Sequence, residues 1–255
     1  MTIERIKNQR SYGRYIRQMT LPEMGKEGQD RLFGSHVLIL GLGGLGSISS
    51  LYLARAGVGR LTIVDYGKVD LPDLNRQILY TQEDIQSFKI DVALERLKEA
   101  NPEVTLRGVC EIIDSDNLSK LVADVDIVLD GLDNFSARMV ANEVCCRKGK
   151  IFVHGGIHGM KGVVSTVVPG EGPCLKCIYE SREPAKVSIP VIGPVPGIVA
   201  CIQSLEAINF LIGAGISLSG RLLMFNGRSL RFFHRLIERK RECPHCGTIQ
   251  IDPDF

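Results

Sequence analysis

A glycine-rich turn between two short apolar runs most constrains how this chain can fold. Residues 37–40 are all apolar, Gly41-Leu-Gly-Gly-Leu-Gly46 follows them directly, and the helix-compatible segment 47–56 leads to a second apolar run, 61–64, which ends at Asp65. This order predicts a strand, a tight turn, a helix and a parallel strand. Glycines let a backbone approach a phosphate closely, and the helix N-terminus behind them offers free N–H groups. The pattern predicts a nucleotide site in which Asp65 bonds a ribose hydroxyl; glycines that serve only close strand–helix packing are the alternative.

The alternation of strands and helices continues along the chain and indicates the fold class. Apolar runs predict further strands at 104–109, 125–129, 151–153 and 163–168, and other segments predict helices at 87–100, 118–122, 135–148 and 197–212. Because such alternation forms parallel sheets with helices on both faces, we expect an α/β fold with a doubly wound, Rossmann-like, mainly parallel sheet. Near the C-terminus, the runs 222–225 and 229–233 flank Asn226-Gly227, a dipeptide typical of two-residue hairpins, which predicts an antiparallel extension.

The domain organisation follows from the absence of any linker or shift in composition between these segments. We expect a single domain over residues 1–255, with an N-terminal helical arm at 1–34 and a nucleotide-binding half at 35–160. Residues 161–255 form the antiparallel extension, which begins with a strand and continues through a proline-rich, loop-rich stretch.

Composition and charge exclude several classes of partner. The chain has 31 basic and 29 acidic residues, for a net charge of +2, and these charges are dispersed. We therefore expect no nucleic-acid partner. No apolar run reaches the roughly 18 residues of a membrane span, and the charged start, MTIERIKNQR, lacks the apolar core of a signal peptide. We expect a cytoplasmic protein with no membrane association.

The eight cysteines point to a metal rather than to disulfides, because we expect them to be reduced. Cys174 and Cys177 form one C-x-x-C pair, and Cys243 and Cys246 form another. Two such pairs suit a tetrahedral, structural zinc site that ties the C-terminal tail to an earlier loop. A redox dithiol is the alternative. The other cysteines, which we interpret as small core residues, are Cys110, Cys145, Cys146 and Cys201.

Charged residues follow the predicted strands at the edge where open α/β sheets bind their ligands. Arg76 lies in the loop after the second strand, where a guanidinium can bind two phosphate oxygens at once. Lys89 lies in the first turn of a predicted helix, an unfavourable place for a cation, so it is either a phosphate ligand or an exposed surface lysine. Asp133 follows the fourth strand and could hold Mg²⁺ against a triphosphate, although it or Asn134 could instead cap the next helix.

From Arg14 to Cys246 the sequence resembles the adenylating enzymes related to ubiquitin-activating enzymes, namely the molybdopterin-synthase and thiamine-biosynthesis adenylyltransferases of the ThiF, MoeB and HesA type. The motifs that carry the resemblance are Arg14-Tyr-Ile-Arg-Gln18, Gly41 to Gly46, Asp65, Asn75-Arg-Gln77, Lys89, Asp130-Gly-Leu-Asp-Asn134 and the two C-x-x-C pairs. The family activity is the attack of a carboxylate on the α-phosphate of ATP, which gives an acyl-adenylate and pyrophosphate. The resemblance therefore implies an enzyme that uses ATP, Mg²⁺ and a structural Zn²⁺.

The resemblance also assigns roles to individual residues. Asp65 holds the ribose, Asp133 holds Mg²⁺, and Arg17 crosses a homodimer interface to reach the partner's phosphates. Arg76 and Lys89 bind the triphosphate. The residues expected around the nucleotide are Gly41, Gly43, Gly44, Asp73, Asn75, Gln77 and Asn134.

Four features depart from the family pattern. Pro72-Asp73-Leu74 stands where Ser-Asn-Leu is usual, so Asp73 places a negative charge where a neutral amide would meet phosphate. Gly67 stands where an acid is frequent. The loop from Pro184 to Gly193 has no cysteine, which argues against a thioester or acyl-disulfide step. His154 and His158 are uncommon at this edge, and either contact an acceptor carboxylate or have a neutral surface role.

Three functions remain open on these grounds. The first is adenylation of the C-terminal glycine of a ubiquitin-like sulfur-carrier protein. The second is adenylation of a small-molecule carboxylate in cofactor biosynthesis, for example a pyridinol carboxylic acid. The third is a non-catalytic nucleotide-binding scaffold, which is disfavoured because Arg76 and Asp133 are both present. A dehydrogenase is disfavoured because no hydride-transfer residues accompany the glycines.

Overall fold

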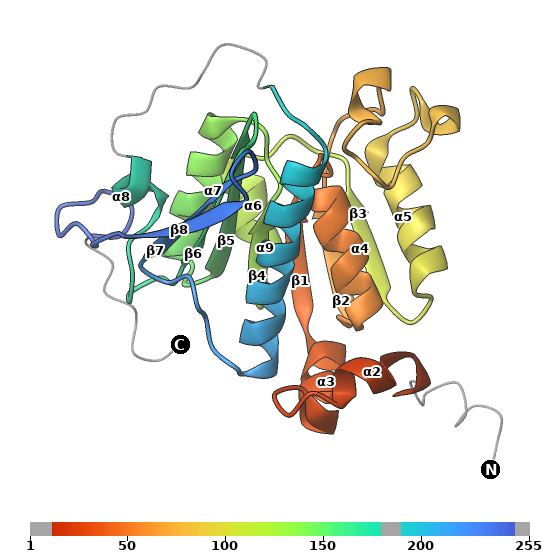
Figure 1. Cartoon of the computed structure of the whole chain (residues 1–255), viewed down its shortest axis with the longest axis horizontal. Coiled ribbons are helices and arrows are strands. Elements are labelled where there is room, and N and C mark those ends of the chain that lie inside the picture. The colour runs from red at the N-terminus through yellow and green to blue at the C-terminus, as the bar shows by residue number, and fades with distance from the viewer. Residues whose placement is uncertain (1–11, 180–189, 248–255) are drawn as a thin grey trace.

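The computed structural model describes residues 12–179 and 190–247 and has one eight-stranded sheet at its centre (Figure 1). The strand order is β3-β2-β1-β4-β5-β6-β7-β8. Strands β1 to β5 pair in parallel and β5 to β8 pair antiparallel. The strands are β1 (His36–Leu40), β2 (Arg60–Val64), β3 (Thr105–Val109), β4 (Ile127–Asp130), β5 (Ile151–His158), β6 (Lys161–Val167), β7 (Arg221–Asn226) and β8 (Arg231–Leu236). The expected Rossmann-like sheet with an antiparallel extension is confirmed.

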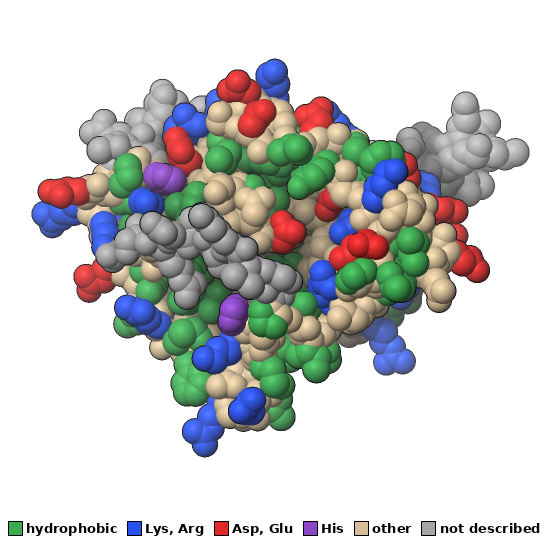
Figure 2. Space-filling model, turned by 90° about the horizontal axis from the view of Figure 1, so that it is seen from above, with side chains coloured by type: hydrophobic (Ala, Val, Ile, Leu, Met, Phe, Trp, Pro, Cys, Tyr) green, Lys and Arg blue, Asp and Glu red, His purple; other side chains and the backbone are tan. Residues whose placement is uncertain are grey.

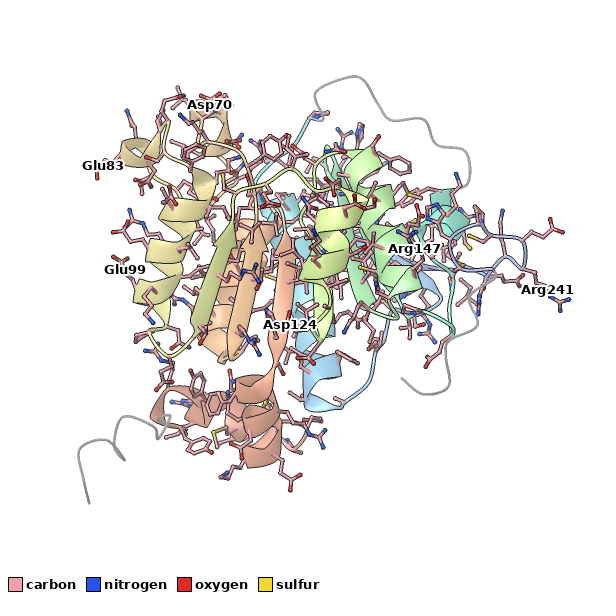
Figure 3. The ribbon with its side chains drawn as sticks, turned by 180° about the vertical axis from the view of Figure 1, so that it is seen from behind. Asp70, Glu83, Glu99, Asp124, Arg147 and Arg241 are labelled. Carbon is pink, nitrogen blue, oxygen red and sulfur yellow. The ribbon has the colours of Figure 1, made fainter. Side chains whose placement is uncertain are left out.

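Helices cover both faces of the sheet. The described α-helices are α2 (Ile16–Met19), α3 (Gly25–Gly34), α4 (Gly46–Ala56), α5 (Lys89–Ala100), α6 (Ser115–Leu121), α7 (Phe135–Arg147), α8 (Leu175–Tyr179) and α9 (Pro194–Ile212), and the 3-10 turns are η1 (Tyr12–Tyr15), η2 (Leu71–Asp73) and η3 (Gln82–Asp84). Helices α4, α5 and α9 lie on one face, and α6 and α7 lie on the other (Figures 1 and 3). Each face has its own apolar core, and the cysteine pairs belong to the α7 side.

The parallel strands are buried because helices cover both of their faces. All five residues of β1 and all four of β4 are buried, which matches the unbroken apolar runs of the sequence. The strand order reverses between β1, which is joined to β2 by α4, and β4. In open α/β sheets this switch point opens a crevice at the carboxyl ends of the strands.

Strand β5 is longer than the sequence indicated. The expected strand ended at Val153, but β5 continues to His158 and pairs along that length with β6. Its two internal glycines hid the strand, because glycine is a poor strand former. Tertiary packing requires one of them: a Cβ on Gly155 would lie 2.6 Å from the side chain of Gln203 in α9.

The C-terminal hairpin also differs from expectation. Asn226 pairs with Arg231, so the turn has four residues between the strands rather than the predicted two. The Asn226 side chain accepts hydrogen bonds from the backbone of Arg228 and Ser229, and this local bonding favours the wider turn. Strand β8 is an exposed edge.

Helix α9 is the described helix whose length and mean hydropathy would allow it to cross a membrane, although Gln203 and Glu206 interrupt its apolar residues. More than half of its most apolar stretch, 56%, is buried inside the fold. It packs on α3, α4, β5 and β6. This is the packing of a core helix.

Candidate active site

The glycine turn lies at the switch point of the sheet. Gly41 has φ +86°, a conformation that L side chains rarely adopt, and a Cβ there would lie 2.6 Å from the carbonyl oxygen of Gly131 after β4. The turn therefore brings the ends of β1 and β4 into contact and opens directly into α4. The N–H groups at the start of this helix lie at the carboxyl edge of the sheet, where an anion can bind.

Asp65, at the end of β2, lies against this turn. Its Oδ2 accepts a hydrogen bond of 2.7 Å from the Leu42 N–H, and its Oδ1 accepts one of 2.7 Å from the Gly67 N–H. Backbone donors from the turn and from its own loop thus fix the carboxylate. This is the placement expected of an acid that holds a ribose.

A cluster of opposite charges lies in the loop that follows β2 and the first turn of α5. The Asp73 carboxylate lies 3.1 Å from Arg76 Nη2 and 3.0 Å from Lys89 Nζ, and it accepts a 2.7 Å hydrogen bond from Gln77 Nε2. Arg76 also donates to the Pro72 carbonyl and to the Asn75 side chain. The side chains of Lys89 and Asp73 are only 13% and 14% exposed, so Lys89 is not the free surface lysine of the alternative interpretation.

This charge cluster adjoins the glycine turn. A Cβ on Gly44 would lie 3.5 Å from Arg76 Cγ, and one on Gly43 would lie 4.0 Å from Gln77 Nε2. Figure 2 looks down on this edge from above and shows acidic and basic side chains interspersed over it.

Two buried polar atoms near the turn have no partner in the described chain, Ser47 Oγ in the first turn of α4 and Gln77 Oε1. Buried polar atoms are normally paired, so orphans beside a glycine turn suit a ligand that brings polar groups. A hydroxyl donor, an amide oxygen acceptor, free helix N–H groups and two cations match the phosphates and hydroxyls of a nucleotide. The residues present therefore fit ATP.

Asp133 and Asn134 follow β4 at the same edge and have different environments. The Asn134 side chain caps α7 by accepting a 2.7 Å hydrogen bond from the Ala137 N–H. Asn134 is therefore the cap of α7, and only its amide NH₂ group could still donate a hydrogen bond to a nucleotide. Asp133 is exposed and leaves its carboxylate available for a cation such as Mg²⁺, which prefers carboxylate oxygens.

A buried polar network beneath this edge was not recognised in the sequence. Asp130, the last residue of β4, is fully buried and binds Arg138 Nε and His154 Nδ1, each at 2.6 Å. His154 Nε2 in turn lies 2.8 Å from the Tyr179 hydroxyl. Burial would raise the pKa of Asp130, but Arg138 and His154 hold that pKa below its ordinary value. A lone acid at the end of an apolar run was the only available signal.

His154 therefore does not lie where the sequence interpretation placed it. Its side chain is fully buried, which rules out a neutral surface role and leaves no exposed edge for an acceptor carboxylate in this conformation. Burial lowers the pKa of His154, although Asp130 opposes this shift. His158, at the end of β5, is exposed.

This network predicts an acid-sensitive fold. The folded-state pKa of His154 lies below its unfolded value of about 6.5, so the unfolded chain binds the proton first and stability falls as the pH falls below that value. We expect the thermal unfolding midpoint to fall between about pH 7.5 and about pH 5.5, with a slope of at most about 1.4 kcal/mol per pH unit from this proton. His154→Gln should flatten the profile, whereas His234→Gln, on exposed β8, should leave it unchanged. An unflattened profile in His154→Gln would contradict the assignment.

Arg17 lies far from the other candidates within one chain. It is exposed on α2, and the neighbouring Gln18 bonds the carbonyl of Ala56, the last residue of α4. The glycine turn lies at the other end of α4, whose 11 residues span about 16 Å. Figure 1 shows α2 and α3 beyond the amino ends of the strands. Arg17 could therefore reach a nucleotide only on another chain.

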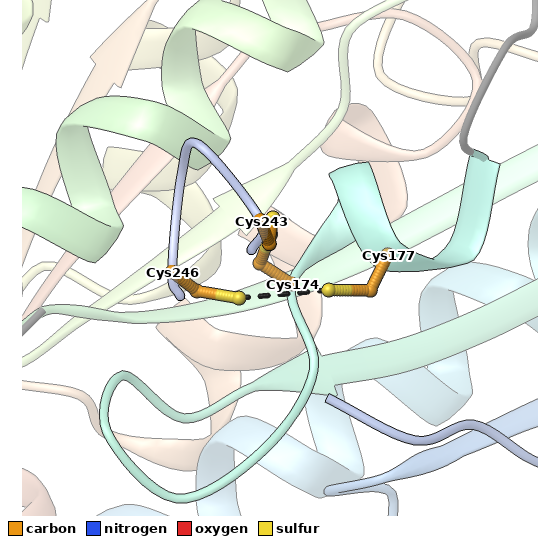
Figure 4. Close-up of side chains that lie close together, drawn as sticks. All are labelled: Cys174, Cys177, Cys243 and Cys246. Carbon is orange, nitrogen blue, oxygen red and sulfur yellow. Dashed lines mark hydrogen bonds between the residues drawn. The ribbon is translucent and has the colours of Figure 1, made fainter. Parts of the chain in front are cut away.

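The two C-x-x-C pairs form one buried cluster (Figure 4). The four Sγ atoms lie within 4.8 Å of one another, with 3.6 Å between Cys174 and Cys243 and 3.5 Å between Cys177 and Cys246. Ligands at 2.3 Å from a tetrahedral Zn²⁺ are about 3.8 Å apart, so these residues fit a structural zinc ion.

The cysteines outside this cluster are not all core residues. Cys145 and Cys146 are buried, as expected, but Cys110 is exposed and Cys201 is partly buried. Cys110 follows the last residue of β3, where the chain leaves the sheet. The interpretation of Cys110 as a core residue was wrong, because this cysteine lies just beyond β3 and its side chain is exposed.

The fold and this edge define the class: the chain is a Rossmann-like α/β protein whose glycine turn lies at the switch point of the sheet. A family model described as the ThiF family matches residues 15–246. The chain therefore belongs to the ThiF family, and it is an adenylyltransferase.

Curated relatives resemble the chain over nearly its whole length. The vegetative protein HesA of Trichormus variabilis is 39% identical over 236 residues, which cover 92% of this chain and 89% of that protein. The sulfur carrier protein ThiS adenylyltransferase of Escherichia coli is 37% identical over 250 residues, 96% of this chain and 99% of that protein. The SAMP-activating enzyme E1 of Haloferax volcanii is 37% identical and covers 94% of this chain and 90% of that protein.

Solved structures share the fold at lower identity. The crystal structure of E. coli MccB with ATP has a TM-score of 0.83 and 24% identity, with 93% of this chain and 75% of that chain covered. The PaaA crystal structure has a TM-score of 0.76 and 23% identity, with 94% of this chain and 76% of that chain covered. These similarities concern the fold alone.

Proposed function

We propose that this enzyme uses Mg²⁺ and ATP to adenylate the C-terminal glycine of a ubiquitin-like sulfur-carrier protein. The observation that carries the proposal is the pair of cations, Arg76 and Lys89, held beside the glycine turn and Asp65 at one edge of the sheet. A triphosphate needs such cations, whereas a dinucleotide of the hydride-transfer type does not. The relative named as an adenylyltransferase of the sulfur carrier ThiS, 37% identical, supports the choice of acceptor.

In the proposed reaction a carboxylate oxygen of the acceptor attacks the α-phosphorus of ATP. A P–O bond forms, the bond to the β-phosphate oxygen breaks, and pyrophosphate leaves with the electron pair. No proton need move, because the carboxylate attacks in its ionised form. The main obstacle is repulsion between two anions, so the protein contributes by positioning the reactants and by neutralising charge.

The residues divide this work between them. Backbone N–H groups at the start of α4 and the side chains of Arg76 and Lys89 bind phosphate oxygens, and Asp65 orients the ribose. Asp133 would hold Mg²⁺, which when bound offsets charge on the phosphates. The four cysteines Cys174, Cys177, Cys243 and Cys246 would hold a zinc ion with a structural role only, because all four positions of a tetrahedral site are filled.

Adenylation of a small-molecule carboxylate is the second candidate. It rests on the absence of cysteine from the loop Pro184 to Gly193, of which residues 184–189 lie outside the described part of the chain. The two candidates, and the non-catalytic scaffold, differ in what they activate. ATP–pyrophosphate exchange should appear with a Gly-Gly-ended carrier protein for the first, only with a small acid for the second, and with neither for the scaffold.

We also propose that the chain is a single domain and forms a homodimer in the cytoplasm. In this dimer, Arg17 of each chain completes the nucleotide site of its partner. Arg17→Ala should dimerise normally and lose at least about 90% of its exchange activity, because the attacked phosphates lose a cation. Arg76→Ala should be inactive as well. Mixing the two variants should restore part of the activity, because each dimer that combines one chain of either variant carries one intact site. Exchange that stays at the level of either variant alone would argue against a shared site.

A further inference from the structure

Asp73 neutralises both of the cations assigned to the triphosphate. Its Oδ1 accepts hydrogen bonds from Arg76 Nη2 at 3.1 Å and from Gln77 Nε2 at 2.7 Å. Its Oδ2 lies 3.0 Å from Lys89 Nζ and accepts a 3.3 Å bond from the Asp70 N–H. Each carboxylate oxygen thus has one cation and one neutral donor. Within the described residues, Arg76 and Lys89 each form an ion pair with Asp73.

This arrangement matters because a triphosphate and Asp73 require the same donors. Free ATP carries about four negative charges at neutral pH, so bringing it to Arg76 and Lys89 places it against a fixed carboxylate. Like charges a few ångströms apart at a partly buried site repel strongly, and the Asp73 side chain is 14% exposed. A divalent cation on the phosphates reduces the ligand's charge by two and weakens this repulsion.

We propose that Asp73 is an internal competitor for the triphosphate: it occupies Arg76 and Lys89 and makes the site selective for metal-complexed ATP over free ATP. The inference rests on the proposed assignment of this edge to ATP. Asp73 thereby determines specificity at the site without taking part in the chemistry.

The geometry favours this role over that of a second metal ligand. Both carboxylate oxygens already face cations, and a carboxylate with two ion pairs has little charge left to attract Mg²⁺. Asp133 at the same edge has no such partner among the described ion pairs and is exposed, which makes it the better ligand. The geometry also exceeds a structural need, because Asp70 is the N-cap of η2 and position 73 has only to accept the Asp70 N–H, which an amide oxygen can do as well.

The test is the binding affinity of ATP and of its non-hydrolysable α,β-methylene analogue, measured by calorimetry with saturating Mg²⁺ and with EDTA. Asp73→Asn removes the charge, keeps the shape of the side chain and leaves the N-cap of η2, Asp70, unaltered. We expect it to tighten metal-free binding about tenfold, since one charge–charge contact of this kind is worth about a decade in affinity. Binding of the magnesium complex should change by less than about threefold, so the preference for the complex shrinks.

Asp70→Asn is the matched control. Asp70 is an exposed carboxylate three residues away in the same loop, labelled in Figure 3, and its side chain accepts from the Leu71 N–H. The control loses the same formal charge but touches neither cation, so its preference for metal-complexed ATP should equal that of the unaltered protein. If Asp73→Asn does not fold, as judged by thermal unfolding, Asp73→Ser repeats the test.

The outcomes separate this inference from the proposed function. An unchanged preference in Asp73→Asn, or an equal change in Asp70→Asn, overturns the inference alone. Weaker binding of the magnesium complex by tenfold or more also overturns it and makes Asp73 a metal ligand. No binding of ATP by the unaltered protein overturns both proposals. The expected shift without exchange on any carboxylate supports the inference and overturns the proposed function.

Discussion

Replacing Asp133 with alanine is expected to reduce Mg²⁺-dependent ATP–pyrophosphate exchange by about 10²- to 10³-fold, a loss of about 3–4 kcal/mol of transition-state stabilisation. The reason is that Asp133 offers an exposed carboxylate at the switch point, next to the glycine turn. In the proposed site, the variant would lack the protein ligand of Mg²⁺, and the charge on the phosphates would be less well neutralised. The measurement is the exchange rate as a function of Mg²⁺ concentration.

Stability and the control make this result specific. Asp133 does not cap α7, because Asn134 does, so Asp133→Ala should unfold within a few tenths of a kcal/mol of the unaltered protein. The control is Asp116→Ala, which removes an exposed carboxylate from the first turn of α6. This variant should keep full exchange activity. Full activity in Asp133→Ala would refute the metal assignment, and a rate restored by high Mg²⁺ would support it.

Loss of the four-cysteine cluster should produce the largest change in stability. A zinc ion there would join Cys177 to Cys243 and close a long loop, and by the loop-closure relation used for disulfides such a cross-link is worth about 4 kcal/mol. We expect Cys243→Ser to lose the metal and to lower the unfolding midpoint by about 8–16 °C, given about 2–4 °C per kcal/mol for a chain of this size. Elemental analysis should find about one zinc per unaltered chain.

The matched control for this second prediction is Cys110→Ser. Cys110 is exposed and lies outside the cluster, so this variant should keep both its zinc and its unfolding midpoint. Chelation of the unaltered protein should reproduce the effect of Cys243→Ser. An unaltered protein that contains no zinc, or a Cys243→Ser variant that is as stable as the control, would remove the structural role of the metal.

The core of the fold could be predicted because its signals are local. The strand, turn and helix from residue 36 to residue 56 follow from contiguous apolar and glycine residues, whose conformational preferences do not depend on distant partners. The cysteine spacing is a similar case, since two C-x-x-C pairs restrict the geometry of any common ligand. The structure brings these four cysteines within 4.8 Å of one another, as the spacing predicted.

Other features depended on partners distant in the sequence and could not be predicted. The length of β5 depends on pairing with β6 and on the close approach of Gln203 to Gly155. The burial of His154 depends on Asp130, 24 residues earlier, and on Tyr179, 25 residues later. Contacts between residues so far apart in the sequence leave no periodic pattern in it. The segment 154–158 therefore looked like an exposed loop, although it is part of β5.

The amino-acid sequence by itself determined the α/β class, the glycine turn, the order of the charged residues and the paired cysteines, because each of these features depends on residues that are close together in the sequence. Only the tertiary structure decided how the charges are partnered. Asp73 departs from the usual residue at its position, but its neutralisation of both Arg76 and Lys89 appears only when the loop after β2 folds onto the first turn of α5. Electrostatic pairing depends on distance in space and on burial, and the fold alone determines both.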